Sequence, residues 1–214
     1  MTKVAALILS YGTTDFLKPC IKQYKWCDKI LVLNYLFPQS EPMHDNTPEI
    51  CMGEGVECIT GGGFNQEDVL NNGMGLLRDY TLAFIVDNDE FILRADQEKL
   101  ISEWKRDRYA KAFIPIIDYY KSLYEKYEQR THHPVVLGEP NATRFYNVRC
   151  SIGGGKYFED IYLHHLGFLF SPKKMEWKKK KQDKTNNGGF DKCISRPTMK
   201  CEPPEELVKL LGEA

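Results

Sequence analysis

The sequence predicts an α/β fold, with one domain built on a mixed, mostly parallel central sheet flanked by helices. Three observations carry this prediction. Residues 1–92 alternate between short apolar runs and segments with helical spacing, which is typical of βαβ units and a parallel sheet. The apolar run at 82–86 has the composition of a strand buried on both faces. The length of 214 residues suits one domain with a sizeable core.

The first elements follow from this alternation. Residues 4–9 are expected to form a buried strand, and 16–26 a helix with apolar residues at helical spacing. The run at 29–33, rich in β-branched residues and leucine, predicts a second strand, which gives a right-handed βαβ opening. The segment 34–46 is rich in Pro, Gln, Ser and Glu and is expected to be a loop.

A helix is expected to start at 47–49, where proline occupies the first helical position, and a short strand at 56–59. The next helix, over 65–77, contains four residues that weaken it, namely Asn71, Asn72, Gly73 and Gly75. Something other than helix propensity must keep them there.

The second half has a more mixed pattern. Its expected elements are a helix over 97–108, strands over 112–117 and 161–166, paired strands within 119–127 and 142–148, and a terminal helix starting near 203–207. The two glycine runs, 61–63 and 153–155, lack the spacing of a phosphate-binding loop and are expected to be flexible loops.

Composition excludes several classes. The formal charge of −1 argues against a general nucleic-acid binder. No apolar run approaches the length that spans a bilayer, and the apolar part of residues 1–10 is very short for a signal peptide, so a cytoplasmic location is expected. Seven cysteines without a Cys-x-x-Cys pair favour reduced, buried thiols over zinc.

The strongest candidate for a functional site is the acidic segment Asp87-Asn88-Asp89-Glu90, directly after the predicted strand 82–86. Open α/β folds bind ligands at the carboxyl ends of their strands. In an extended chain both aspartates would lie on one side and Asn88 on the other. Carboxylate oxygens suit Mg²⁺ or Mn²⁺, and either ion would bring a phosphate-bearing substrate. The alternative, a solvated strand end, is less favoured because the acids follow a buried strand.

This segment, Phe84-Ile85-Val86-Asp87-Asn88-Asp89-Glu90-Phe91-Ile92, resembles the metal-binding Asp-x-Asp segment of GT-A fold glycosyltransferases, in particular the inverting family 2-like group. Three other segments resemble parts of that group in the same order. They are 6–14 for the turn that holds the nucleotide base, 70–74 for the helix before the motif, and His164-His165-Leu166-Gly167 for the late metal-binding histidine.

Two positions depart from the family pattern. Leu33-Asn34-Tyr35-Leu36 replaces the acidic turn that contacts the base, and Leu70 replaces an arginine. The resemblance implies one GT-A-like, Rossmann-like domain. Residues 1–92 would form the nucleotide-sugar half, 93–171 the acceptor half, and 172–214 a basic segment and tail.

The implied activity is metal-dependent, inverting transfer of a sugar from a nucleotide-diphosphate sugar to a hydroxyl of a glycan, protein or lipid-linked acceptor. Two alternatives stay open. One is a nucleotidyltransferase, and the other is a non-catalytic carbohydrate- or nucleotide-binding module on the same fold.

The resemblance also implies site residues. The metal, Mn²⁺ or Mg²⁺, would be held by Asp87, Asp89 and His165, and an imidazole ligand favours Mn²⁺. His165 is preferred to His164 because it matches the late histidine, and neighbours on a strand face opposite ways. The expected donor-binding residues are Leu9, Ser10, Tyr11, Asn71, Asp87, Asn88 and Lys178.

Transfer also requires a base for the acceptor hydroxyl. The candidates are Asp160 first, then Glu159 and Asp118, and the pair His132-His133 is expected at the surface or on the acceptor side. A lysine-rich segment, 173–184, has three interpretations, ranked as a solvated face, a cover for the leaving diphosphate, or a contact with an anionic membrane.

Overall fold

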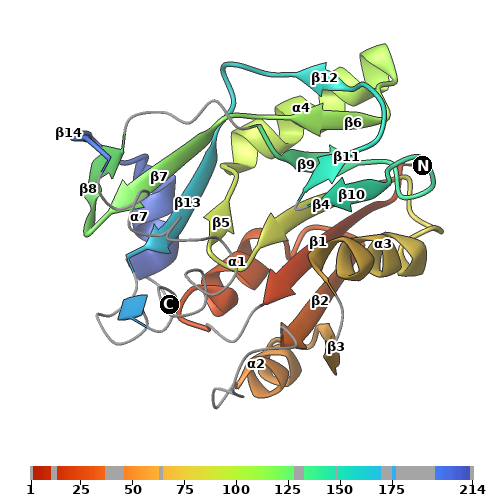
Figure 1. Ribbon diagram of the computed structural model, residues 1–214, viewed down its shortest axis with the longest axis horizontal. Helices are drawn as coiled ribbons and strands as arrows, with labels where there is room; N and C mark the ends of the chain where they lie inside the picture. The colour runs from red at the N-terminus through yellow and green to blue at the C-terminus, as the bar shows by residue number, and fades with distance from the viewer. Residues whose placement is uncertain are drawn as a thin grey trace.

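The computed structural model describes residues 2–10, 14–36, 46–62, 65–127, 133–147, 149–169, 175–176 and 196–212. These residues form a seven-stranded sheet with helices on both faces, a five-stranded sheet beside it and a small hairpin (Figure 1). In the large sheet, four of the six neighbouring strand pairs are parallel. The predicted α/β class with a mixed, mostly parallel sheet is therefore confirmed.

The large sheet has the strand order β12-β6-β9-β4-β1-β2-β3. Its strands are β1 (Val4–Ser10), β2 (Lys29–Leu36), β3 (Glu57–Gly62), β4 (Leu82–Asp87), β6 (Lys111–Phe113), β9 (Val135–Gly138) and β12 (Lys156–Tyr157). Strand β1 lies between β2 and β4 and is parallel to both. Strand β9 enters antiparallel between β4 and β6.

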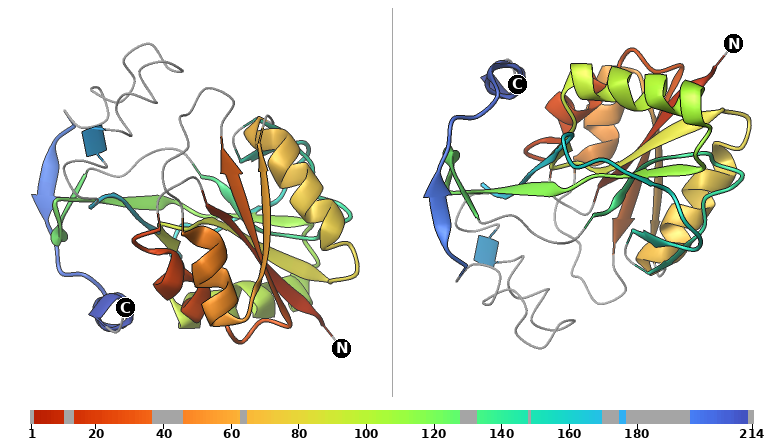
Figure 2. Two further views of the ribbon diagram at one scale, coloured as in Figure 1. Left: turned by 90° about the horizontal axis from the view of Figure 1, so that it is seen from below. Right: turned by 90° about the horizontal axis from the view of Figure 1, so that it is seen from above.

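Four helices cover this sheet, namely α1 (Leu17–Gln23), α2 (Thr47–Glu54), α3 (Gln66–Leu76) and α4 (Arg94–Asp107). Figure 2 shows α3 on one face and the other three on the opposite face. Residues of β1 alternate between the two resulting cores, with Ile8 facing the α1 and α4 side and Leu7 facing α3. Burial on both faces explains why the central strands are continuously apolar.

Gly73 shows why α3 keeps a residue that weakens helices. A Cβ atom at this position would lie 2.7 Å from Leu33 Cδ1 and 2.8 Å from Leu7 Cδ1. The helix therefore packs onto β1 and β2 at a distance that only glycine permits, and close packing replaces the propensity that the glycine loses.

The second sheet has the order β14-β8-β7-β13-β5. Its strands are β5 (Glu90–Phe91), β7 (Ile116–Tyr120), β8 (Ser122–Tyr127), β13 (Leu163–Phe168) and β14 (Thr198–Lys200). Strand β13 is parallel to β7 and antiparallel to β5. Since β5 follows β4 after only two residues, the turn Asn88-Asp89 joins the two sheets.

Two smaller elements complete the fold. The hairpin β10 (Phe145–Asn147) and β11 (Cys150–Ser151) lies over α3. The terminal helix α7 (Glu205–Gly212) buries Leu207 in the core on the α1 side. Glu206 of α7 also accepts a hydrogen bond from the Arg94 backbone N–H at 2.8 Å, and so caps the start of α4.

Two sequence predictions for the second half are wrong. The strand expected over 112–117 is split, because Pro115 cannot donate to a ladder, and β6 and β7 on either side of it belong to different sheets. The expected pairing of 119–127 with 142–148 is also absent. Strand β7 folds back on β8 at Lys121, which has a left-handed φ of 60°, and β10 pairs with β11.

Candidate active site

The acidic segment is a turn, so the expectation of an extended chain through Asp87, Asn88 and Asp89 is wrong. Strand β4 ends at Asp87, and Asn88 and Asp89 reverse direction into β5. The Asn88 backbone N–H donates to the Leu9 carbonyl at 2.8 Å, and its side chain donates to Ser10 Oγ at 3.2 Å. These bonds fix the turn against the end of β1.

Polar side chains also gather at the neighbouring strand ends. Buried Ser10 shares a hydrogen bond of 3.0 Å with Thr47 Oγ1 at the start of α2. Asn34 lies beside Ser10 in register, and its Oδ1 is shielded from solvent without a hydrogen-bond partner among the described residues. Asn34 was not among the predicted site residues. Its position at the end of the second strand was the available signal.

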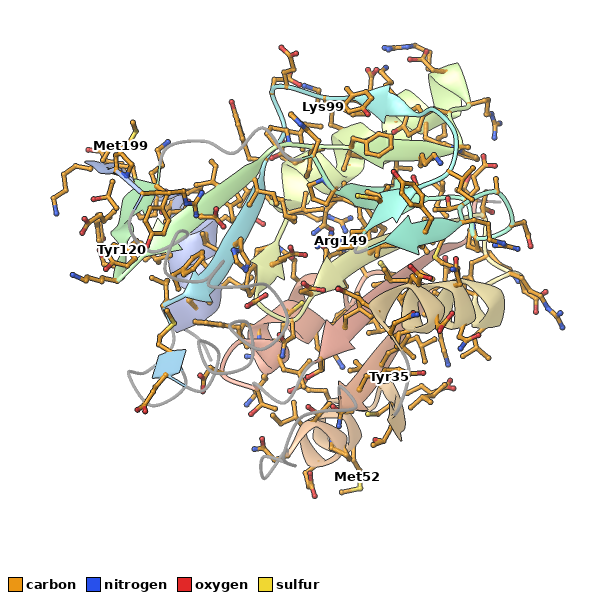
Figure 3. The ribbon with its side chains drawn as sticks, in the orientation of Figure 1. Tyr35, Met52, Lys99, Tyr120, Arg149 and Met199 are labelled. Carbon is orange, nitrogen blue, oxygen red and sulfur yellow. The ribbon has the colours of Figure 1, made fainter. Side chains whose placement is uncertain are left out.

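Glu90 serves the architecture of the turn. Its carboxylate accepts a hydrogen bond from the Asp87 backbone N–H at 2.8 Å and forms an ion pair with Arg149, both side chains being 5% exposed or less. Arg149 also donates to the carbonyls of Ile85 at 2.8 Å and Val135 at 3.3 Å. It lies beside β4 near the centre of the molecule (Figure 3). This pair joins the turn to β4 and β9.

Asp87 has an unusual environment. Its Oδ1 is shielded from solvent and has no hydrogen-bond partner among the described residues. Burial, followed by the charge of Glu90, raises the pKa of Asp87 to about 7, and Asp89 adds to this while Arg149 and His165 oppose it. A carboxyl group in this state can accept a hydroxyl or ammonium donor, or a cation, that the described residues do not supply.

Asp89 faces His165 across the junction of the two sheets. The distance from His165 Nε2 to Asp89 Oδ2 is 3.7 Å. The other ring nitrogen of His165, Nδ1, lies 2.6 Å from Asp118 Oδ1, and Asp118 Oδ2 accepts a bond from Arg196 at 3.1 Å. Asp118 is buried and accepts from Nδ1, and this bond orients the ring so that Nε2 faces Asp89.

The neighbouring His164 points the other way, as the two-residue repeat of a strand predicts. It is buried, and its Nδ1 shares a hydrogen bond of 2.9 Å with the Tyr119 hydroxyl. Burial, with a smaller contribution from the charge of Lys126, lowers the pKa of His164 to about 4. His165 is thus the member of the pair that lies with the acidic turn, and its role as a metal ligand stays a prediction.

The donor set around Asp89 fits a divalent cation that also binds phosphate. In the described ranges no three His, Cys, Asp or Glu side chains form a ready-made metal cluster. Such a cluster is not required, because Mg²⁺-type sites often use one or two carboxylates and complete their shell with substrate phosphates and water. Asp89 and His165 provide an oxygen and a nitrogen, a combination that Mn²⁺ accepts.

The other predicted site residues are exposed, have partners of their own, or lie outside the described residues. Asp160 is exposed and paired with Lys99 of α4, which Figure 3 places apart from Arg149, and Glu159 beside it is also exposed. The Asn71 amide makes two hydrogen bonds of 3.0 Å with the backbone of Phe145. Tyr11, His132 and Lys178 lie outside the described residues, as does most of segment 173–184.

Two further observations concern the whole chain. No helix in the part that the structure describes combines the length and the apolar composition needed to cross a membrane. The described cysteines form no disulfide bonds with one another, and two of them, Cys20 and Cys51, are buried.

Neither the known protein-family models nor the curated protein sequences contain a match to this chain. Among solved structures, S. aureus TarS 1–349 in complex with UDP-GlcNAc is similar with 10% identity and a TM-score of 0.43, covering 55% of this chain and 35% of that one. Glucosyl-3-phosphoglycerate synthase from Mycobacterium tuberculosis, in complex with Mn²⁺, UDP and glucosyl-3-phosphoglycerate, has 8% identity and a TM-score of 0.42, covering 57% and 46%.

A putative glucose-1-phosphate thymidylyltransferase from Bacillus anthracis, in complex with a sucrose, has 9% identity and a TM-score of 0.40 and covers 99% of this chain and 95% of that one. The chain thus spans about a third of the TarS fragment and under half of the synthase. Two of these neighbours are bound to UDP or to UDP-GlcNAc, and the third is a putative thymidylyltransferase. With TM-scores below 0.5, their likeness does not assign this chain a family or an activity.

Proposed function

We propose that the chain is a metal-dependent glycosyltransferase that transfers a sugar, with inversion, from a nucleotide-diphosphate sugar to an acceptor hydroxyl. The observation that carries this proposal is the arrangement at the end of β4. Asp89 and His165 approach to 3.7 Å there, and Ser10, the last residue of the adjacent strand β1, lies in register with Asn34 near the end of β2. An α/β sheet binds nucleotides at this edge.

The donor would lie across the ends of β1, β2 and β4. Asn34 Oδ1 lacks a partner among the described residues and lies beside Ser10, so this pair is placed to contact the nucleoside. The free Oδ1 of Asp87 can accept a ribose hydroxyl. Asp89 and His165 would hold Mn²⁺ or Mg²⁺, which when bound neutralises charge on a departing diphosphate.

The chain's own residues prepare this site before a donor arrives. Asp118 and Arg196 fix the ring of His165, and the bonds from Asn88 to Leu9 and Ser10 fix the turn that carries Asp89. Both oxygens of Asp118 are engaged, which favours a positioning role for this residue. Asp160 and Glu159 stay our candidates for the base that accepts the acceptor proton.

A thermal-shift screen of nucleoside diphosphates and nucleotide sugars, with and without Mn²⁺, tests the proposal. We expect one class of nucleotide to raise Tm only when Mn²⁺ is present, by an amount equivalent to about 2.7 kcal/mol at a hundred-fold excess over Kd. Asp89→Asn should abolish the shift and leave the fold intact. The matched control is Asp79→Asn, which changes an exposed acid after α3.

The products distinguish the alternatives. Release of a nucleoside diphosphate with formation of a glycoside supports the transferase, and release of pyrophosphate identifies a nucleotidyltransferase. Metal-dependent binding without turnover identifies a binding module. A protein that shows no metal-dependent shift with any nucleotide is not a nucleotide-sugar enzyme of this kind.

A further inference from the structure

A second cavity lies next to the acidic turn, with a volume of about 310 Å³. It opens where β6 ends and β9 begins, against the hairpin β10–β11. Its lining consists of Phe113, His133, Tyr146, Arg149, Cys150, Ser151, Gly153 and Tyr157. The cavity thus lies at the same carboxyl edge of the large sheet as Asp87, on the β6 side of β4.

One residue links this cavity to the proposed donor site. Arg149 lines the cavity and forms the buried ion pair with Glu90. The same Glu90 carboxylate accepts the hydrogen bond from the Asp87 backbone N–H. The cavity therefore borders the acidic turn along the same edge of the sheet, so that ligands bound at the two places would be neighbours.

Aromatic rings form one wall. Tyr157 stacks on Phe113 with ring centroids 4.6 Å apart and an interplanar angle of 12°, and His133 meets Tyr157 edge-on at 6.0 Å. Tyr157 is nevertheless 62% exposed, and Tyr146 is 59% exposed. Two exposed aromatic rings beside a cavity supply apolar faces with polar edges, which suits a ligand of the same mixed character.

The polar part of the lining carries little net charge. Arg149 is neutralised by Glu90. Ser151 Oγ has no hydrogen-bond partner among the described residues, which is costly for a shielded hydroxyl and leaves it able to bond to a ligand. Flat apolar faces, an available hydroxyl and a paired charge favour a neutral ligand that bears hydroxyl groups.

The glycine run 153–155 lies in a loop, as predicted, and is packed at its last residue. A Cβ atom at Gly155 would lie 2.6 Å from the Lys111 carbonyl oxygen and 2.7 Å from Phe113 Cε2. Gly153 has a left-handed φ of 82°, and Lys111 donates to the Ile152 carbonyl beneath it. The cavity is thereby formed in advance, which lowers the entropic cost of binding.

We propose that this cavity binds the acceptor, and that the acceptor is a neutral saccharide whose sugar ring lies against Tyr157 and Tyr146 with a hydroxyl on Ser151. A pyranose ring has C–H faces and a rim of hydroxyl groups, which match the aromatic and polar parts of the lining. The volume accommodates a single ring. As an acceptor site, the cavity rests on the transferase function proposed above.

Binding of saccharides can be tested without donor or metal. Saturation-transfer NMR on the full chain would use methyl glycosides of glucose, galactose, mannose and N-acetylglucosamine. We expect at least one to bind, and Tyr157→Ala or Tyr146→Ala to raise its Kd by about ten-fold or more. Tyr124→Ala is the matched control, because Tyr124 is 58% exposed on β8 and belongs to the other sheet, and it should leave Kd unchanged.

A steady-state assay adds a second readout. Tyr157→Ala should raise the KM for the saccharide acceptor and leave the KM for the donor unchanged. Ser151→Ala should weaken acceptor binding by a few-fold, about the loss of one neutral hydrogen bond.

The outcomes separate this inference from the proposed function. The cavity assignment is overturned if no methyl glycoside binds, or if Tyr124→Ala weakens binding as much as Tyr157→Ala. It is also overturned if tyrosine amide, an aromatic probe without a sugar ring, binds in the cavity in preference to the sugars. Metal-dependent nucleotide binding would survive each of these results. If saccharide binding depends on Tyr157 but the protein binds no nucleotide, the assignment of the cavity as a saccharide site is supported and the proposed transferase function is contradicted.

Discussion

Two pairs of side chains flank the acidic turn, each consisting of an acid and a nitrogen base, and the two pairs have different roles. On one side, Glu90 and Arg149 are buried, in direct contact and bonded to backbone on β4 and β9. On the other side, Asp89 is also buried, but its nearest contact with His165 is 3.7 Å long, the His165 side chain is 15% exposed, and Asp118 orients the ring. A buried pair in direct contact stabilises one arrangement of the chain, whereas two side chains held 3.7 Å apart are placed to share a ligand.

The largest effect is expected when one member of the buried pair, Glu90 or Arg149, is removed. Glu90→Ala leaves the Arg149 charge buried and unpaired, so we expect the free energy of unfolding to fall by about 3–5 kcal/mol in denaturant titrations. A combined Glu90→Ala and Arg149→Met variant should recover part of this loss. If Glu90→Ala costs less than about 1 kcal/mol, the pair has no architectural role.

Asp118→Asn tests the role of the pair of Asp89 and His165. The substitution removes the anionic acceptor that fixes His165, and we expect the affinity for Mn²⁺ in the presence of nucleotide to fall about 10- to 100-fold by calorimetry. His164→Gln, one residue from His165 but directed into the core, is the control and should leave this affinity unchanged. Equal losses of Mn²⁺ affinity in both variants would mean that the affinity depends on an intact β13 and not on the orientation of His165.

The stability of the protein should depend on pH through His164, the buried one of the two adjacent histidines. The unfolded chain protonates His164 near its ordinary pKa of 6.5, whereas the folded chain does so only at about 4. The unfolded state therefore binds more protons between these values, and stability falls as the pH drops through this window. We expect this residue to contribute a loss of about 2 kcal/mol from pH 7 to 5, measured as the difference between wild type and His164→Gln in urea.

The smallest effect is expected at the exposed pair of Lys99 and Asp160. Lys99→Ala should leave the free energy of unfolding nearly unchanged, because both side chains are solvated. This sharpens the contrast with Glu90 and Arg149, an ion pair that is buried and also bonded to the backbone. A loss of several kcal/mol would show that the 159–162 segment depends on this contact.

The elements that sequence could predict are those set by neighbours along the chain. The run of apolar residues ending at Asp87 predicted the strand correctly and placed the candidate site at its end, and the two-residue repeat separated His164 from His165. The pair of Glu90 and Arg149 could not be foreseen, since its members are 59 residues apart and nothing local to Arg149 marks it. Strand β9 was missed for the same reason, because its place between β4 and β6 depends on non-local pairing.

For two glycines, the reason for the residue lies in other elements of the fold and cannot be predicted from the sequence. The sequence identified Gly73 as a residue that helix propensity does not explain, and the reason lies in the side chains of Leu7 and Leu33 on other elements. The same holds for Gly155, whose neighbours Lys111 and Phe113 lie on β6. Both positions report close packing, which becomes visible only when the partners are known.

The place of β9 has a consequence for how the chain is made. During synthesis β1, β2 and β4 can pair as soon as they leave the ribosome, but β9 follows β4 by about fifty residues, which takes several seconds at ordinary elongation rates. Until then the edge of β4 is an open, apolar template for other strands. We therefore expect the nascent chain to depend on chaperones until β9 closes that edge and Arg149 reaches Glu90.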